Sequence, residues 1–180
     1  MKNISTKKGD NGQSDLANGR RLSKANLRFE VIGDLDELNS WLGVVVAKMD
    51  QPFRQQADFL QFLQNQLFIV GAEIAQAKKV EVDRKLLVLI EQRSEKLQQQ
   101  MTDDWHSSFL LPGGVETAAW LDVARTICRR TERHLVKLKQ RQTVRPILLK
   151  ILNRLSDYLY ALRCYVNHKL NYQEQEFDNK

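Results

Sequence analysis

Residues 146–166 read PILLKILNRLSDYLYALRCYV, and this stretch decides the fold class. Its apolar residues recur every three or four positions, which is the period of one buried face of an α-helix. The stripe comprises Leu148, Ile151, Leu152, Leu155, Leu159, Leu162 and Val166. Because Pro146 suits the first turn of a helix, we expect this helix to begin near Thr143, as its cap, and to continue to about Leu170.

The same helical period appears in four segments upstream. They cover about 29–49, 54–78, 82–101 and 115–140. Eight glycines and three prolines in 180 residues are few chain breakers, which favours long helices over a turn-rich β protein. The sequence shows no strand pattern and no internal repeat. We therefore predict an all-α protein, a five-helix bundle of the ferritin-like, up-and-down kind.

The chain is expected to form one helical domain with two polar ends. Residues 1–28 lack helical periodicity and carry Gly9, Gly12 and Gly19, so they form either a disordered tail or a ligand-binding loop. Residues 29–170 form the predicted bundle. The remaining residues, 171–180, are a polar tail that we expect to fray.

Composition and charge limit the classes of function. Lys and Arg number 28 against 22 Asp and Glu, and the net charge of +6 favours anionic partners. A nucleic-acid partner is not expected, because no basic patch interleaved with aromatics and no recognition-helix motif is present. No apolar run is long enough to span a bilayer, so no membrane partner is expected either. Two cysteines make no disulfide framework, so we expect a reducing, cytoplasmic setting.

Arginine gathers on one face of the predicted helix 115–140. Arg125, Arg129 and Glu132 lie at helical spacing on this face, and Arg130 lies beside them. Such a face is either a solvated basic surface or an anion clamp, since arginine forks bind phosphate in bidentate fashion. Asp36, on the first predicted helix, is either an exposed acid or an ion-pair partner for these arginines.

Compact polar residues form a second stripe along the fifth predicted helix. The stripe comprises Asn153, Asp157, Tyr160, Cys164 and Asn167. A plain surface stripe would more often consist of Lys, Glu and Gln, so this one indicates a partly buried, hydrogen-bonded seam. The seam either joins helices or binds a ligand, and the pattern leaves both readings open.

The familiar catalytic sets are missing from the sequence. His106, His134 and His168 lie far apart, and there is no P-loop and no nucleophile elbow. Cys128 and Cys164 lie on helix flanks, so we predict buried structural thiols rather than nucleophiles. If the protein is an enzyme, it binds and orients reactive partners instead of supplying a nucleophile.

Three segments together carry a resemblance to a known family. The first runs from TKKGDNG at 6–12, through Gly19, Lys24 and Arg28, to GDLDELNS at 33–40. The second is FLLPGG at 109–114 followed by ARTICRRTER at 124–133, and the third is LNRLSD at 152–157. In this order and spacing they resemble the PduO-type ATP:cob(I)alamin adenosyltransferases, or corrinoid adenosyltransferases.

The resemblance implies a homotrimer of five-helix bundles with active sites between subunits. It implies transfer of the 5′-deoxyadenosyl group of ATP to the cobalt of reduced corrinoid, forming adenosylcobalamin and releasing triphosphate. The implied bound groups are ATP, Mg²⁺ and cobalamin as substrate, with no metal held by protein side chains alone. Since Co(I) is the nucleophile, the corrinoid carries the hard chemistry. A cobalt reductase and an enzyme that accepts adenosylcobalamin are the implied protein partners.

The resemblance also assigns site residues. The implied ATP-binding residues are Thr6, Gly9, Asp10, Gly12, Lys24, Arg129, Arg130, Glu132 and Asn153. The implied catalytic residues are Arg125, Arg129 and Phe109. Phe109 would occupy the lower face of the corrin ring and keep a polar axial ligand from cobalt, which makes the Co(II) form easier to reduce. Asp36 would pair with Arg125 across the subunit boundary.

The sequence departs from the commoner family pattern, mostly in the proposed phosphate loop. The departures there are Gln13, Ser14, Asp15, Ala17 and Asn18. Outside the loop, Leu27 replaces a proline before Arg28, and Asp122 replaces a histidine on the fourth predicted helix. Asp15 adds a carboxylate near the triphosphate, which is unfavourable unless it faces solvent or metal. The alternative hypothesis is therefore a module of the same fold that binds ATP or corrinoid with weak or no transferase activity.

Overall fold

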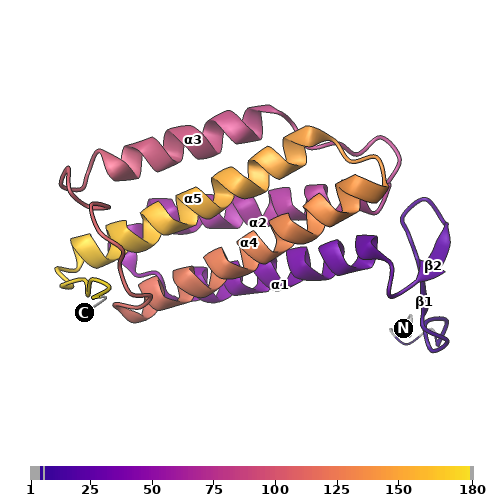
Figure 1. Cartoon of the computed structure of the whole chain (residues 1–180), viewed down its shortest axis with the longest axis horizontal. Coiled ribbons are helices and arrows are strands. Elements are labelled where there is room, and N and C mark those ends of the chain that lie inside the picture. Colours follow the sequence, from indigo (N-terminus) through magenta and orange to yellow (C-terminus); the bar gives the residue numbers. More distant parts are fainter. Residues whose placement is uncertain (1–4, 6, 179–180) are drawn as a thin grey trace.

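Five long helices lie side by side (Figure 1), which confirms the predicted all-α class. The computed structural model of the chain describes Ser5 and residues 7–178. The helices are α1 (Leu27–Lys48), α2 (Arg54–Ile74), α3 (Lys85–Gln98), α4 (Glu116–Arg141) and α5 (Pro146–Lys169). A short 3₁₀-helix, Gln51–Phe53, connects α1 to α2. No helix in the described residues is both long enough and apolar enough to cross a membrane.

Helix α5 supplies the centre of the core. It packs against α3 and α4, while α1 packs against α2 and α4. Every member of the apolar stripe that begins at Leu148 and ends at Val166 is at most 1% exposed. Each position of the stripe faces another helix and is therefore apolar, which is why the helical period could be recognised in the sequence.

Several helix ends differ from the predicted ones. Helix α5 begins at Pro146, and its N-cap is Arg145, not Thr143. Helix α2 ends at Ile74, and the chain turns at Gln76, whose φ is +61°. The Glu73 carboxylate accepts a hydrogen bond from the Val82 amide at 2.8 Å and pairs with Arg145 at 3.1 Å. The turn at Gln76 ends the helix where periodicity alone would have continued it, and the contacts of Glu73 join the following segment to the residue before α5.

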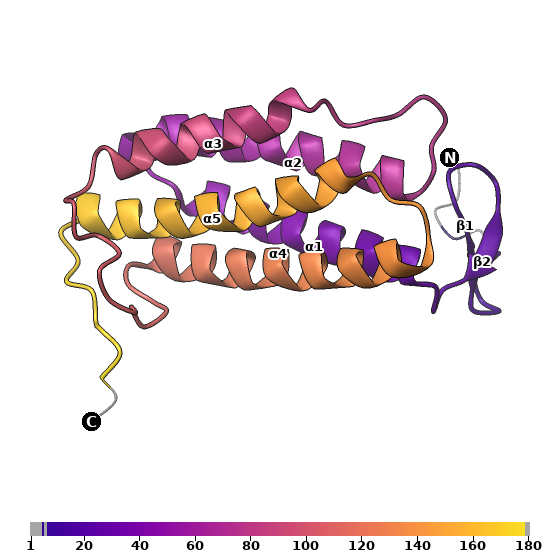
Figure 2. The same ribbon diagram turned by 45° about the horizontal axis from the view of Figure 1, so that its top comes forward.

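A two-stranded antiparallel hairpin corrects the expectation that the chain contains no strand. Its strands are β1 (Gln13–Asp15) and β2 (Arg21–Ser23), with Ser14 opposite Leu22. Three residues per strand are too few for an alternating pattern to be visible in the sequence. The hairpin lies at the end of the bundle where α1 begins (Figures 1 and 2).

The hairpin turn is docked on the end of α2. Leu16 is buried, and the Ala17 amide donates to the Ala75 carbonyl at 3.0 Å. The Asn18 side chain donates to Gln76 Oε1 at 2.8 Å. The N-terminal segment is therefore anchored to the bundle, which favours the ligand-loop reading over the disordered tail.

The C-terminal segment is also docked, so the prediction that it frays is wrong for residues 171–178. The Phe177 amide donates to the Phe109 carbonyl at 2.7 Å, and the Leu111 amide donates to the Gln175 carbonyl at 2.8 Å. Leu110 and Glu176 form an antiparallel bridge between these bonds. The pairing uses main-chain groups, which leave no signature in the side-chain pattern.

Candidate active site

The N-terminal loop brings together Gly9, Gly12 and Lys24. The Gly12 amide donates to the Gly9 carbonyl at 3.2 Å, and the Lys24 amide donates to the Gly12 carbonyl at 2.8 Å. Gly12 has a φ of +70°, a conformation that glycine adopts without strain. A Cβ at Gly9 would lie 3.1 Å from Lys24 Nζ, so the lysine ammonium lies over the loop backbone. Such a loop offers amides and a cation to an anion.

The acidic residues of the N-terminal loop, Asp10 and Asp15, are exposed to solvent. The Asp10 side chain is exposed, and Thr6 lies outside the described residues. Asp15 is exposed and forms an ion pair with Arg21 at 3.1 Å across the hairpin. The extra carboxylate that distinguishes this loop is therefore matched by a cation on the hairpin surface.

The arginines of α4 divide into two groups. Arg130 is paired with Asp34, at 3.3 Å, and with Glu37, both on α1. The Arg125 guanidinium lies over the Tyr160 ring, 5.1 Å from its centroid, and Arg129 is exposed. Within the described chain neither Arg125 nor Arg129 has a carboxylate partner. Of the predicted anion clamp, these two guanidinium groups remain available to a ligand.

Glu132 and Asn153 join α4 to α5 beside these arginines. The Asn153 side chain donates to Glu132 Oε1 at 3.4 Å, and Asn153 is exposed. Over residues 7–178, no hydrogen bond or ion pair connects the glycine loop with Arg125 or Arg129. Within one chain, the two predicted halves of the ATP site, which are the glycine loop and the arginines of α4, are therefore not in contact through a hydrogen bond or ion pair of the described residues.

Asp36 lies in a shallow hollow of about 390 Å³ on the face of α1 and α2. The hollow also includes Asn39 and Phe68, whose side chain is 66% exposed. Asn39 Oδ1 is buried and accepts no hydrogen bond from any described residue. In the described chain Asp36 forms no ion pair with Arg125.

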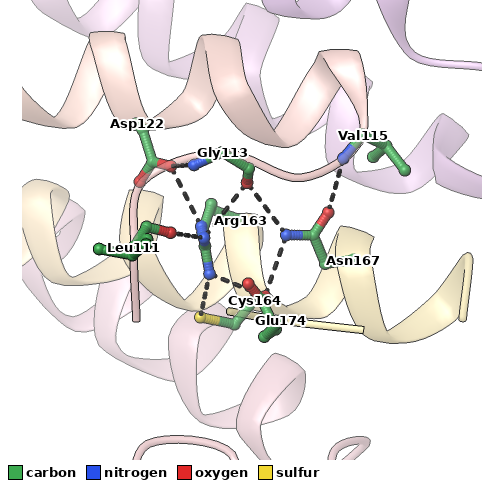
Figure 3. A network of polar contacts seen from close by, with 8 residues as sticks. All are labelled: Leu111, Gly113, Val115, Asp122, Arg163, Cys164, Asn167 and Glu174. Atoms are coloured by element: carbon green, nitrogen blue, oxygen red, sulfur yellow. Dashed lines mark hydrogen bonds and ion pairs between the residues drawn. The ribbon is translucent and has the colours of Figure 1, made fainter. Parts of the chain in front are cut away.

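Phe109 is an exposed aromatic side chain on a fixed loop. The ring is 86% exposed, while the loop that carries it is held by hydrogen bonds from α4 and α5 (Figure 3). Gly113 donates its amide to Asp122 at 2.8 Å and accepts from Arg163 at 3.2 Å. Gly114 has a φ of +117°, and a Cβ there would lie 2.2 Å from Asn167 Nδ2, so only glycine fits.

Arg163 is the main site-region residue that the sequence analysis missed. It is 1% exposed, and it pairs with Asp122 at 3.2 Å and Glu174 at 2.7 Å. The available signal was a single charged residue between apolar neighbours on the most buried helix. Asp122, the departure noted on this helix, thus balances a buried cation.

The compact polar stripe on α5 is buried at one end and exposed at the other. Cys164 and Asn167 are buried, and Asn167 donates to the Gly113 carbonyl at 3.2 Å, so this end of the stripe is structural. Asn153 and Asp157, at the other end, are exposed. Between the two ends, burial raises the pKa of Tyr160 to about 12, so its hydroxyl stays protonated at neutral pH.

Cys128 is buried as predicted. Its thiol donates to the Leu152 carbonyl at 3.3 Å, and burial raises its pKa, which makes it inert as a nucleophile. In the described part of the chain, no group of three or more His, Cys, Asp and Glu side chains is placed to hold a metal ion.

Known proteins share the sequence pattern and the fold of this chain. The family model described as cobalamin adenosyltransferase matches residues 4–166. The corrinoid adenosyltransferase of Bacillus subtilis is 35% identical over 178 residues, which cover 96% of this chain and 91% of that protein. The cobalamin adenosyltransferase of Cupriavidus metallidurans is 34% identical, covering 93% and 89% of the two chains.

A solved structure shows the same fold. A variant PduO-type ATP:corrinoid adenosyltransferase from Lactobacillus reuteri, complexed with cobalamin and ATP, matches with a TM-score of 0.92 at 30% identity. The match covers 98% of this chain and 97% of that one. Sequence and architecture agree over nearly the whole length, and the chain belongs to the cobalamin adenosyltransferase family.

Proposed function

We infer that this protein is an ATP:corrinoid adenosyltransferase, which transfers the 5′-deoxyadenosyl group of ATP to the cobalt of cob(I)alamin and releases triphosphate. The observation that carries the inference is that the guanidinium groups of Arg125 and Arg129 are not neutralised by a carboxylate of the described chain. Neither has a carboxylate partner in the described chain, although the adjacent Arg130 has two. Guanidinium groups left open in this way suit the phosphates of ATP.

The chain's own residues have two tasks in this reaction. They hold the 5′-carbon of ATP in line with the cobalt nucleophile, which is catalysis by positioning. They also stabilise the negative charge of the leaving triphosphate. Arg129, with Glu132 and Asn153, serves the second task from α4 and α5, and the loop of Gly9, Gly12 and Lys24 wraps the phosphates. Arg130, predicted above to bind ATP, is paired with Asp34 and Glu37, so here it is proposed to support the site by holding α4 against α1.

Mg²⁺ fits this site as an ion carried by the nucleotide. It prefers oxygen ligands and is usually bound by one or two carboxylates together with substrate phosphates. The exposed carboxylate of Asp10, on the glycine loop, is a ligand of that kind. Bound there, the ion would neutralise part of the triphosphate charge.

A homotrimer with shared sites accounts for the separated halves of the ATP site. Asp36 lies exposed beside Phe68, and Arg125 lacks an acid within the described chain, so the two suit a pair between subunits. At micromolar concentration, sedimentation equilibrium is expected to give three times the 21.0 kDa of one chain. A monomer under these conditions would contradict the shared site, because half of each site would be absent.

The remaining partners follow from the chemistry. Cob(I)alamin must be supplied by a reductase acting on cobalt, and the adenosylated product is taken up by an enzyme that uses it. Both cysteines are unpaired and buried, which suits a reducing, cytoplasmic setting.

One optical assay tests the proposed activity. ATP is added to chemically reduced cob(I)alamin and the protein, and we expect the visible spectrum of adenosylcobalamin together with one released triphosphate per corrinoid. Light should cleave the new carbon–cobalt bond and reverse the spectrum. Tight ligand binding without product would instead select the binding-module hypothesis. A salt-sensitive shift of nucleic acid in a gel, without product, would support a nucleic-acid binder.

A further inference from the structure

We propose that Glu174 is a positioning residue of the transferase reaction. It fastens the C-terminal segment 171–177 to the loop that carries Phe109, and it acts through the buried guanidinium of Arg163 (Figure 3). The proposal rests on the function proposed above and on the role that the family resemblance implies for Phe109, at the lower face of the corrin ring.

Arg163 is the point where three segments meet. Its Nη2 donates to the Leu111 and Gly113 carbonyls, at 2.8 and 3.2 Å, so it holds the loop before α4. Its Nε donates to Asp122 on α4, and its Nη1 donates to Glu174 at 2.7 Å. One planar group with fixed donor directions thereby sets the loop, the helix and the C-terminal segment relative to one another.

Glu174 contacts both side chains that hold the loop. Its Oε1 accepts from Arg163 and also from Asn167 Nδ2, at 3.0 Å. Asn167 in turn accepts from the Val115 amide at 3.1 Å, directly before α4. A change at Glu174 therefore reaches the loop through both Arg163 and Asn167, which also donate to the same Gly113 carbonyl.

The C-terminal segment pairs with the main chain at Phe109 and at Leu111, on either side of Leu110. Its hydrogen bonds are those from the Phe177 amide to Phe109 and from the Leu111 amide to Gln175. Because the Phe109 ring is 86% exposed, few side-chain contacts fix its place, and the position of its backbone decides where the ring lies. The segment fixes that backbone, and Glu174 fixes the segment.

Glu174 can be removed without stranding a buried charge. Arg163 keeps Asp122 as its partner at 3.2 Å, so the positive charge of the guanidinium is still balanced by one carboxylate. Variants at Glu174 are therefore expected to fold and to report on positioning.

The test compares three variants of the full chain. Glu174→Ala removes both hydrogen bonds, whereas Glu174→Gln keeps an oxygen that can accept from Arg163 and Asn167. Glu176→Ala is the matched control, because it removes the same charge from the same segment at an exposed side chain without a hydrogen bond or ion pair in the described chain. Kinetics are measured with corrinoid and ATP varied separately.

We expect Glu174→Ala to lower kcat/KM for the corrinoid by between about 10- and 100-fold, as misplaced groups do. The KM for ATP should change by less than about twofold, because the ATP residues are on other segments. Glu174→Gln should recover most of the loss, and Glu176→Ala should match the wild type. Hydrogen exchange at the amides of Leu111 and Phe177 should be faster in Glu174→Ala alone.

A second readout concerns the cobalt. With ATP present, Co(II) corrinoid bound to the wild type should lose its axial ligand in the electron paramagnetic resonance spectrum, and Glu174→Ala should retain that ligand. An active wild type with an equally active Glu174→Ala would overturn the proposal. So would equal losses for ATP and corrinoid, which indicate general destabilisation. An inactive wild type would instead overturn the proposed function, and with it the role for Glu174.

Discussion

Replacing Arg129 by alanine is expected to lower kcat for adenosylation by about 100- to 1,000-fold, the usual effect of removing one group that stabilises developing charge. Arg129 is exposed and has no carboxylate partner in the described chain, so its removal breaks no ion pair there. Alanine is also the best helix former, so α4 should be unaffected. The far-UV circular dichroism spectrum is therefore expected to match that of the wild type.

The matched control for this variant is Lys137→Ala. Lys137 is an exposed basic residue farther along the same helix, so its replacement changes the net charge by the same amount. We expect its kcat to stay within about twofold of the wild type, since exposed charges at a distance are screened. A wild-type rate in Arg129→Ala would refute the assignment of the nucleotide site. Equal losses in both variants would indicate a general effect of charge.

Replacing Arg163 by leucine is expected to lower the free energy of unfolding by about 3–5 kcal/mol, the usual effect of breaking a buried ion pair. The substitution leaves Asp122 and Glu174 without their cation and removes the donor to the Leu111 and Gly113 carbonyls. Urea unfolding followed by circular dichroism measures the change. The protein concentration must be fixed, because subunit association contributes to the apparent stability.

Arg154→Leu is the control, because the two arginines share a helix and a pattern of partners. Arg154 pairs with Glu91 and Asp157, both at 2.9 Å, but its side chain is 38% exposed against 1% for Arg163. Ion pairs in solvent contribute little, so we expect a loss below about 1 kcal/mol. Similar losses in the two variants would contradict the argument that burial sets the size of the effect.

The helices could be predicted from the sequence because the core repeats their period. Every apolar residue of the α5 stripe faces a neighbouring helix, so the pattern is unbroken from Leu148 to Val166. The hairpin and the docked C-terminal segment could not be predicted in this way. Their strands are short, and they are held mainly by main-chain hydrogen bonds, such as that from Phe177 to Phe109.

The candidate site shows a similar division. The sequence placed Arg129 and Arg130 together on one helix, but only the packing of α1 against α4 distinguishes them, by supplying Asp34 and Glu37 to Arg130. The partners of Arg163 come from positions 41 and 11 residues away, on a different helix and on the C-terminal segment. A local pattern cannot reveal a pair formed over such separations.

The glycine loop and the aromatic loop lie at opposite ends of the bundle, as Figures 1 and 2 show. In the proposed trimer, every catalytic pocket is a joint product of two polypeptides. Damage inherited in one copy would then disable pockets whose other half is intact. A defect confined to one half would disable one pocket for each defective copy, so activity falls in proportion to the defective fraction. Two copies damaged in different halves would restore one another, because a mixed trimer contains a pocket built from their two intact halves.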